Sequence, residues 1–136
     1  MIVDTSAIVA IWRREAGSER LSEALLGAED HLMSAATYLE LCCVLDSRDE
    51  PLNSRLLDRL LRLYEIKIVP FTARQAELAR QAYRDFGKGG GHPARLNFGD
   101  CFSYALAADS DQPLLFVGND FGHTDVVSAL TTSPGL

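Results

Sequence analysis

The chain has 136 residues, of which 47% are hydrophobic, and its formal net charge is −6. This length supports one compact domain and is too short for two, so we expect a single domain over residues 1–130 and a frayed tail over residues 131–136. No stretch approaches the roughly 20 apolar residues of a membrane span, so we expect a cytoplasmic protein without a membrane partner. The negative net charge argues against a generic nucleic-acid coat protein.

The first half of the chain alternates short apolar runs with segments of helical composition. The apolar run 1–3 predicts a strand, and residues 31–34 are a candidate for a second one. Leucines at helical spacing after the polar break 47–51 predict an amphipathic helix. Helices are expected over residues 7–14, 17–27, 35–45 and 52–63.

The second half continues this alternation. Residues 66–71 form a β-branched run that predicts a strand, after which Thr72 and Gln75 predict a capping box at the start of a helix. Three consecutive glycines and a proline within residues 87–93 predict a mobile loop. Asn97 is the expected cap of the next helix. The remaining expected elements are helices over residues 72–86 and 98–108, a strand over residues 114–117 and a short final element over residues 124–130.

This alternation predicts an α/β fold of three layers (α/β/α), with a mostly parallel central sheet between two layers of helices. In such folds the carboxyl ends of the strands meet at one edge, where ligands usually bind. Four acids lie at element ends or on inward-facing helices, and at separations near 5 Å each pair would repel by roughly 3 kcal/mol at an effective dielectric of about 20. Protons or bound cations would relieve that repulsion. The four acids are Asp4, Glu40, Asp100 and Asp120.

A cluster of carboxylates offers only oxygen ligands, which favour Mg²⁺ or Mn²⁺. Such ions promote phosphodiester hydrolysis without a nucleophilic side chain. We assign Asp4 and Asp100 as the principal metal ligands, Glu40 as a ligand through water or the orienter of the attacking water, and Asp120 as the ligand of a weaker site. Supporting positions around these acids are assigned to Thr5, Ser6 and Asn119.

Each acid also has a purely structural explanation. Asp4 could be an N-cap with no further role. Asp100 could be a first-turn acid that interacts with the helix dipole and has no other function. Asp120 could belong to an Asn-Asp turn. Glu40 could be a solvated helix acid, but its neighbours are apolar, and a buried carboxylate there would need a partner.

Two cations flank the glycine-rich loop. Lys88 and Arg95 could follow a nucleic-acid backbone near the acids. Scattered surface cations with no such role are the alternative.

Residues 1–7, 34–40, 96–102 and 114–121, the last extending through 124–126, occur in an order and at separations that resemble the PIN-domain nucleases. More narrowly, they resemble the VapC toxins of bacterial toxin–antitoxin pairs. The resemblance implies a Mg²⁺- or Mn²⁺-dependent endoribonuclease that cuts structured RNA of the tRNA or rRNA class. It also implies a homodimer and inhibition by a cognate VapB-like antitoxin, whose C-terminal segment often delivers an Arg into the acids.

Carried over position by position, the acids of that family fall on Asp4, Glu40, Asp100 and the pair formed by Asn119 and Asp120. Many relatives have two adjacent acids at this last place, where the present chain has Asn119. For a ribonuclease we expect that Asp4→Asn or Asp100→Asn abolishes RNA cleavage. We also expect either change to leave thermal stability equal or raised, because it removes one repelling carboxylate.

Two other functions are compatible with parts of the pattern. A catalytically idle PIN-like module could keep the fold to hold a protein or RNA, and Asn119 leaves room for that alternative. A phosphotransfer domain of the response-regulator kind also has acids at strand ends. Its chemistry needs a lysine at the end of a later strand, which this sequence does not provide.

Overall fold

The computed structural model describes residues 1–27, 30–46 and 51–130. Residues 47–50 of the expected polar break and the expected tail over residues 131–136 lie outside the described residues. The strands are β1 (Ile2–Val3), β2 (His31–Ser34), β3 (Ile66–Val69) and β4 (Leu114–Leu115). The helices are α1 (Thr5–Trp12), α2 (Ser18–Gly27), α3 (Ala35–Asp46), α4 (Pro51–Leu63), α5 (Ala73–Phe86) and α6 (Phe98–Ser110), with a 3₁₀ helix, η1, at Phe121–His123.

The strands form one parallel sheet in the order β3-β2-β1-β4. Ile2 lies opposite Leu32 on one side and Leu114 on the other, so β1 is a central strand. Both residues of β1 are fully buried. This agrees with an apolar run at the start of the chain, because strands of parallel sheets are covered on both faces.

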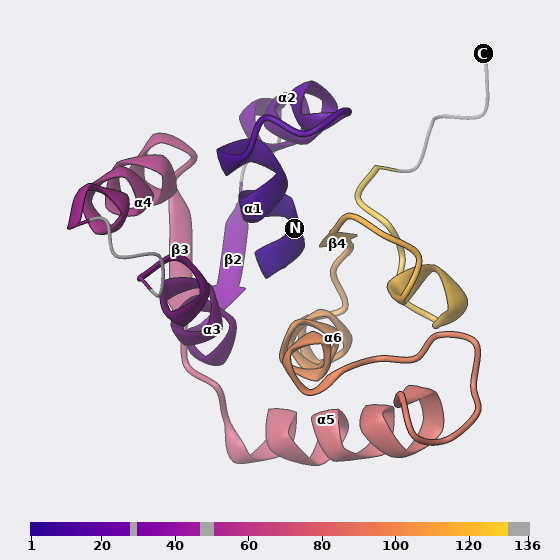
Figure 1. Ribbon diagram of the computed structural model, residues 1–136. Coiled ribbons are helices and arrows are strands. Elements are labelled where there is room, and N and C mark those ends of the chain that lie inside the picture. The colour runs from indigo at the N-terminus through magenta and orange to yellow at the C-terminus, as the bar shows by residue number, and fades with distance from the viewer. Residues whose placement is uncertain (28–29, 47–50, 131–136) are drawn as a thin grey trace.

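Helices cover both faces of the sheet (Figure 1). On one face, Val3 and Leu115 pack with buried residues of α1, α2, α3 and α4. On the other, Ile2 and Leu114 pack with buried residues of α5 and α6. Successive strand residues point to opposite faces, so each two-residue strand contributes to both cores. The three-layer α/β/α architecture expected from the sequence is confirmed.

Several element boundaries differ from the sequence-based expectation. Helix α1 begins at Thr5 rather than residue 7, and α6 continues to Ser110 before Asp111 turns into the left-handed region at φ 52°. Strand β4 is shorter than residues 114–117, because the chain leaves the sheet toward a turn at Gly118, whose φ is 102°. The final element expected over 124–130 is wrong: η1 precedes that segment, which contributes an isolated bridge to β4.

The two predicted helix caps are realised to different degrees. Asn97 and Asp100 form a reciprocal capping box at the start of α6. At α5, Thr72 accepts from the backbone of Gln75, but the Gln75 side chain donates to Asp109 instead of returning to Thr72. Within the described ranges, no helix combines the length and apolar character that crossing a bilayer requires.

Candidate functional site

Asp4 lies at the end of β1 and is only 3% exposed. Its Oδ2 accepts hydrogen bonds from the Ser6 amide at 3.0 Å and the Ser6 hydroxyl at 2.7 Å. Its Oδ1 accepts from the Ser103 hydroxyl at 2.5 Å. The first of these bonds caps α1. Asp4 is therefore a helix cap, as the structural alternative holds, and it also faces the other acids.

The sequence reasoning missed Ser103 and Thr37. Ser103 is 1% exposed on α6, and Thr37, on α3, is fully buried with its Oγ1 3.3 Å from the Ser103 Oγ. A signal was available, because Ser103 follows Asp100 by three residues and so shares its helix face. A hydroxyl on an otherwise apolar helix face marks a buried polar contact.

Asp100 occupies the first turn of α6. Its Oδ2 accepts from the backbone of Asn97 at 3.0 Å, and its own backbone donates to the Asn97 side chain at 2.8 Å. Burial raises the pKa of Asp100 to about 7, with further increases from the charges of Asp4, Asp120 and Glu40, while the bond from Asn97 opposes the rise. All three other acids therefore act electrostatically on Asp100.

Glu40 reaches the same region from the middle of α3. Burial raises its pKa, the hydrogen bond from Thr5 lowers it, and the charge of Asp4 raises it again. Thr5 Oγ1 donates to Glu40 Oε1 at 2.8 Å, which supplies the partner that a half-buried glutamate needs. A Cβ on Gly99 would overlap Glu40 Oε2, so glycine at that position lets the carboxylate approach α6.

Asp120 and Asn119 are exposed in the loop that follows β4. Asp120 precedes η1 but makes no capping bond with its side chain. The backbone of Val117 donates to the Ser6 hydroxyl at 3.0 Å, so the start of this loop is tied to the residue that holds Asp4. Ser6 therefore supports the site from two directions.

The donor chemistry of these acids fits a divalent cation, because all of their ligand atoms are oxygens. The negative charges of Asp4 and Glu40 repel that of Asp100 and raise its pKa. A bound cation would relieve this repulsion between carboxylates. Among the described residues, no three His, Cys, Asp or Glu side chains are gathered closely enough to hold one ion as they stand. Glu40 Oε2 and Asp100 Oδ1 accept no hydrogen bond from the described residues. These two oxygen atoms are therefore available to turn toward a cation.

Lys88 and Arg95 lie at the two ends of the loop between α5 and α6. The Lys88 amide donates to the Leu96 carbonyl at 2.9 Å, and the Leu96 amide donates to the Phe86 carbonyl at 2.8 Å. Both cations are exposed, and Arg95 has a left-handed φ of 53°. These two backbone hydrogen bonds hold the ends of the loop together beside the start of α6.

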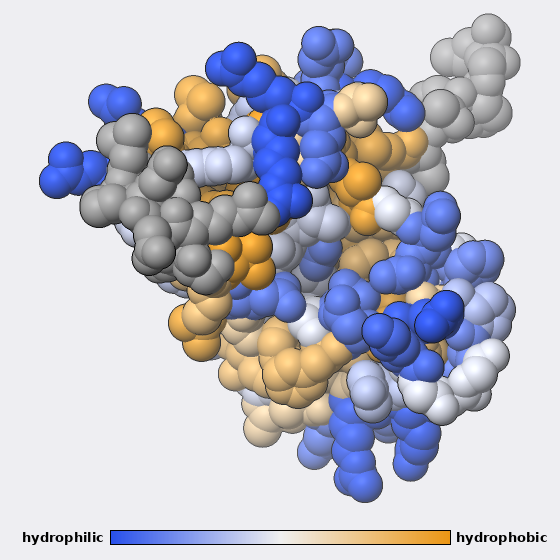
Figure 2. Space-filling model, in the orientation of Figure 1, coloured by the Kyte–Doolittle hydropathy of each residue, from blue (hydrophilic) through white to orange (hydrophobic). Residues whose placement is uncertain are grey.

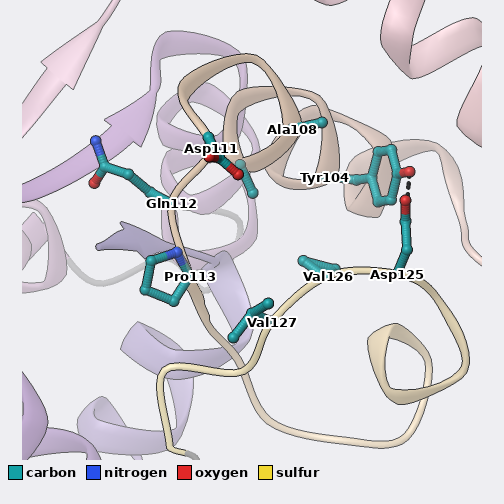
Figure 3. A pocket seen from close by; sticks show the side chains of 9 residues that line it. Tyr104, Ala108, Asp111, Gln112, Pro113, Asp125, Val126 and Val127 are labelled. Carbon is teal, nitrogen blue, oxygen red and sulfur yellow. Dashed lines mark hydrogen bonds between the residues drawn. The ribbon is translucent and has the colours of Figure 1, made fainter.

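A separate pocket of about 350 Å³ lies at the opposite end of α6 (Figure 3). There the Tyr104 hydroxyl donates to Asp125 at 2.6 Å, and burial, followed by Asp125, raises the pKa of Tyr104. This pocket contains none of the four predicted acids. It is distinct from the carboxyl edge of the sheet.

Known proteins resemble this chain in sequence and fold. The profile of the PIN domain matches residues 1–127. Ribonuclease VapC28 of Mycobacterium tuberculosis is 58% identical over 130 residues, covering 96% of this chain and 98% of the relative. The crystal structure of Mycobacterium tuberculosis VapC20, described as a Sarcin-Ricin loop cleaving toxin, superposes with a TM-score of 0.69 at 18% identity, covering 93% of this chain and 95% of that one. A toxin–antitoxin complex from Klebsiella pneumoniae gives a TM-score of 0.66 at 17% identity, covering 94% and 96% of the two chains. The resemblance seen in the sequence is confirmed, and the chain belongs to the PIN-domain family and, within it, to the VapC ribonucleases.

Proposed function

We propose that this protein is a Mg²⁺- or Mn²⁺-dependent endoribonuclease toxin that acts in the cytoplasm. The observation that carries the proposal is a set of contacts between Asp4, Glu40 and the start of α6. Ser103 of α6 donates to Asp4, and Gly99, the neighbour of Asp100, lies against Glu40. The raised pKa of Asp100, to which Asp4, Glu40 and Asp120 contribute, agrees with these contacts. Maintaining four nearby carboxylates costs stability unless cations bind there. The name of the 58% identical relative, a ribonuclease, supports the same reaction class.

Each acid has a role that its surroundings support. A bound divalent cation would activate water and neutralise charge on the phosphoryl oxygens. Asp4, held by two serines, and Asp100 would hold it. With a pKa of about 7, Asp100 is only partly protonated near neutral pH when no cation is present, and it would give up that proton on binding. Glu40 Oε2 would orient the attacking water and accept its proton, and Asp120 would complete a weaker second site.

The proposed substrate is a structured RNA of the tRNA or rRNA class. The structural relative VapC20 is described as cleaving the Sarcin-Ricin loop, a statement about that protein that supports an RNA of this kind. Lys88 and Arg95, exposed beside the start of α6, would contact phosphates that flank the cleaved bond. Arg can contact two phosphate oxygens at once, whereas Lys acts as a point charge.

The proposed protein partner is a cognate VapB-like antitoxin. One structural relative was solved as a toxin–antitoxin complex. An arginine delivered by the antitoxin would pair with the carboxylates at the edge of the sheet and compete with a cation for Asp100 and Glu40.

We also propose a homodimer through the apolar surface over α5 and the start of α6 (Figure 2). Phe98 is 74% exposed there and Tyr83 is 48% exposed. The groove between them is almost wholly apolar, with Phe71, Ala76, Arg80 and Phe102 among its lining residues. Phe98→Glu should convert the dimer to a monomer in analytical ultracentrifugation, and Val127→Glu, at an exposed valine outside that groove, should not.

The test of the proposed activity is cleavage of purified tRNA and of an rRNA fragment, with Mg²⁺, with Mn²⁺ and with chelator. Cleavage should require a divalent cation and disappear in Asp100→Asn. Asp111→Asn is the matched control, because it removes an exposed carboxylate at the other end of α6 and asparagine tolerates the left-handed backbone there. Cleavage that survives in Asp100→Asn would refute the assignment, and sequencing of the new RNA ends would identify the site.

A catalytically idle PIN-like module that binds protein or RNA is the second candidate. It is favoured by one observation, that no three acid, Cys or His side chains converge as they stand in the described residues. Titration calorimetry separates the two candidates. Heat of binding with millimolar Mg²⁺ or Mn²⁺ supports the enzyme, and its absence supports the idle module.

A further inference from the structure

Within the part of the chain that the structure describes, the hydrogen bonds of Asp4 leave one of its lone pairs open. An ionised carboxylate has about four acceptor sites, two on each oxygen. Both sites on Oδ2 are taken by the amide and hydroxyl of Ser6. On Oδ1, Ser103 takes one. The open site is therefore on Oδ1, the oxygen that Ser103 holds.

The proton positions follow from the same contacts. The Ser103 hydroxyl has one proton, and Asp4 Oδ1 accepts it at 2.5 Å. Thr37 must then be the donor in its 3.3 Å contact with Ser103 Oγ. Thr37 and Ser103 are both essentially inaccessible to solvent, so water does not replace either bond.

We propose that Ser103, oriented by Thr37, is a positioning residue that fixes the direction in which Asp4 Oδ1 presents its open lone pair to a divalent cation. The inference rests on the proposed function. It adds a buried Thr–Ser pair from α3 and α6 to the residues that determine metal affinity. Partners that orient a ligand in this way typically change metal affinity by about 10- to 100-fold when they are removed.

The experiment measures Mn²⁺ affinity by titration calorimetry on the full chain, with thermal unfolding of the metal-free protein recorded in parallel. Ser103→Ala should weaken Mn²⁺ binding by about 10-fold or more. Ser110→Ala is the matched control on the same helix, because its hydroxyl donates only to the Leu106 carbonyl of α6. It should leave Mn²⁺ affinity unchanged.

Thr37→Val removes the contact between Thr37 and Ser103 and keeps the hydrogen bond between Ser103 and Asp4. It should weaken Mn²⁺ binding about three-fold, the size of one net hydrogen bond. In the double variant the Thr37 change should add nothing to the Ser103 change, because Thr37 acts through Ser103. Should Ser103→Ala not fold, Thr37→Val alone decides, and wild-type affinity in it overturns the inference.

The possible failures are distinguishable. Mn²⁺ binding by the wild type with unchanged affinity in Ser103→Ala overturns the positioning role and leaves the proposed function intact. A further outcome is that the single variants at Thr37 and Ser103 lose Mn²⁺ affinity equally and that the two losses add in the double variant. That result overturns the claim that Thr37 acts through Ser103. A wild type that binds no Mn²⁺ overturns the proposed function together with this inference.

Discussion

The end of β1 and the start of α6 each place an aspartate at the same edge of the sheet, but they hold it differently. Asp4 is buried and accepts three hydrogen bonds, two of them from hydroxyls. Asp100 accepts one backbone hydrogen bond, and burial with three neighbouring acids raises its pKa to about 7. Hydrogen bonds within the fold compensate the negative charge of Asp4. The negative charge of Asp100 is poorly compensated and favours binding of a proton or a cation.

This difference separates two contributions that a sequence pattern treats as equal. A carboxylate that accepts several hydrogen bonds, as Asp4 does, stabilises the fold and is pre-oriented for binding, so its removal should damage both properties. A carboxylate that is poorly compensated stores repulsion, so its removal should damage binding and improve stability.

The largest expected effect is on RNA cleavage by the two asparagine variants. Both Asp4→Asn and Asp100→Asn should lose more than about 100-fold in activity, since even outer partners of a metal ligand cost 10- to 100-fold. Their thermal stabilities should move in opposite directions. At pH 8 Asp100→Asn should unfold at a higher temperature, because asparagine still accepts from the Asn97 backbone without the charge.

For Asp4→Asn the structure reverses the expectation of equal or raised stability. An amide at position 4 has one acceptor oxygen where Asp4 has two, so one hydroxyl loses its acceptor, at a cost of about 1–3 kcal/mol. Melting curves of the metal-free variants measure both shifts. A rise in both, or a fall in both, would remove the distinction between the two aspartates.

The next effect is the pH dependence of stability. The pKa of Asp100 lies near 7 in the folded chain, above its ordinary value of 3.8, so the folded state binds more protons between those limits. Stability of the metal-free protein should therefore fall as the pH rises from about 4 to about 7, by about 2 kcal/mol after allowance for solvent screening. Asp100→Asn should flatten this slope, and a slope that persists in the variant would assign it to another group.

Gly99→Ala should affect activity more than stability. Alanine is a better helix former than glycine by about 1 kcal/mol, but its Cβ would displace Glu40 Oε2. Cleavage should fall about 10-fold, as for the loss of one outer contact, while the melting temperature stays level or rises. Gly122→Ala, where a Cβ meets no atom within 4 Å, is the control. Full activity in Gly99→Ala would show that the position of Glu40 is not critical.

The smallest expected effect is that of Thr5→Val. The Thr5 hydroxyl lowers the pKa of Glu40, so its removal should raise that pKa. The acid limb of the pH–rate profile should move to higher pH, because the ionised carboxylate loses a hydrogen bond that stabilises it. Thr124→Val, whose hydroxyl donates to the Phe121 carbonyl, provides a comparison. An unshifted profile would mean that Glu40 does not titrate in the reaction.

Local signals were sufficient for most of the fold. Apolar runs gave the position of all four strands, and Asn97 gave the start of α6. The errors arise where local rules compete with tertiary contacts. Gln75 leaves the predicted capping box because Asp109 of α6 accepts from it, and the chain leaves β4 early because Gly118 turns it away.

The sequence pattern selects the four acids as candidates but does not indicate what surrounds them. The sequence allows Asp4 to be either a cap or a functional residue, and in the structure it caps α1 while facing the other acids. Ser103 and Gly99 contact acids that are distant in sequence, Asp4 and Glu40 respectively. Helical spacing places Ser103 on the face of Asp100, but it does not identify the distant partner of Ser103 or of Gly99, because tertiary packing alone brings these pairs together.

The bond between Ser103 and Asp4 spans 99 positions of the chain, and β1 pairs with β4 near residue 115. The first 115 or so residues must therefore leave the ribosome before the acid edge can assemble. At about 5–20 residues per second, the nascent polypeptide passes several seconds without a complete centre. Folding of the acid edge is therefore coupled to synthesis of the second half of the protein, because neither Asp4 nor β1 has its partner before then.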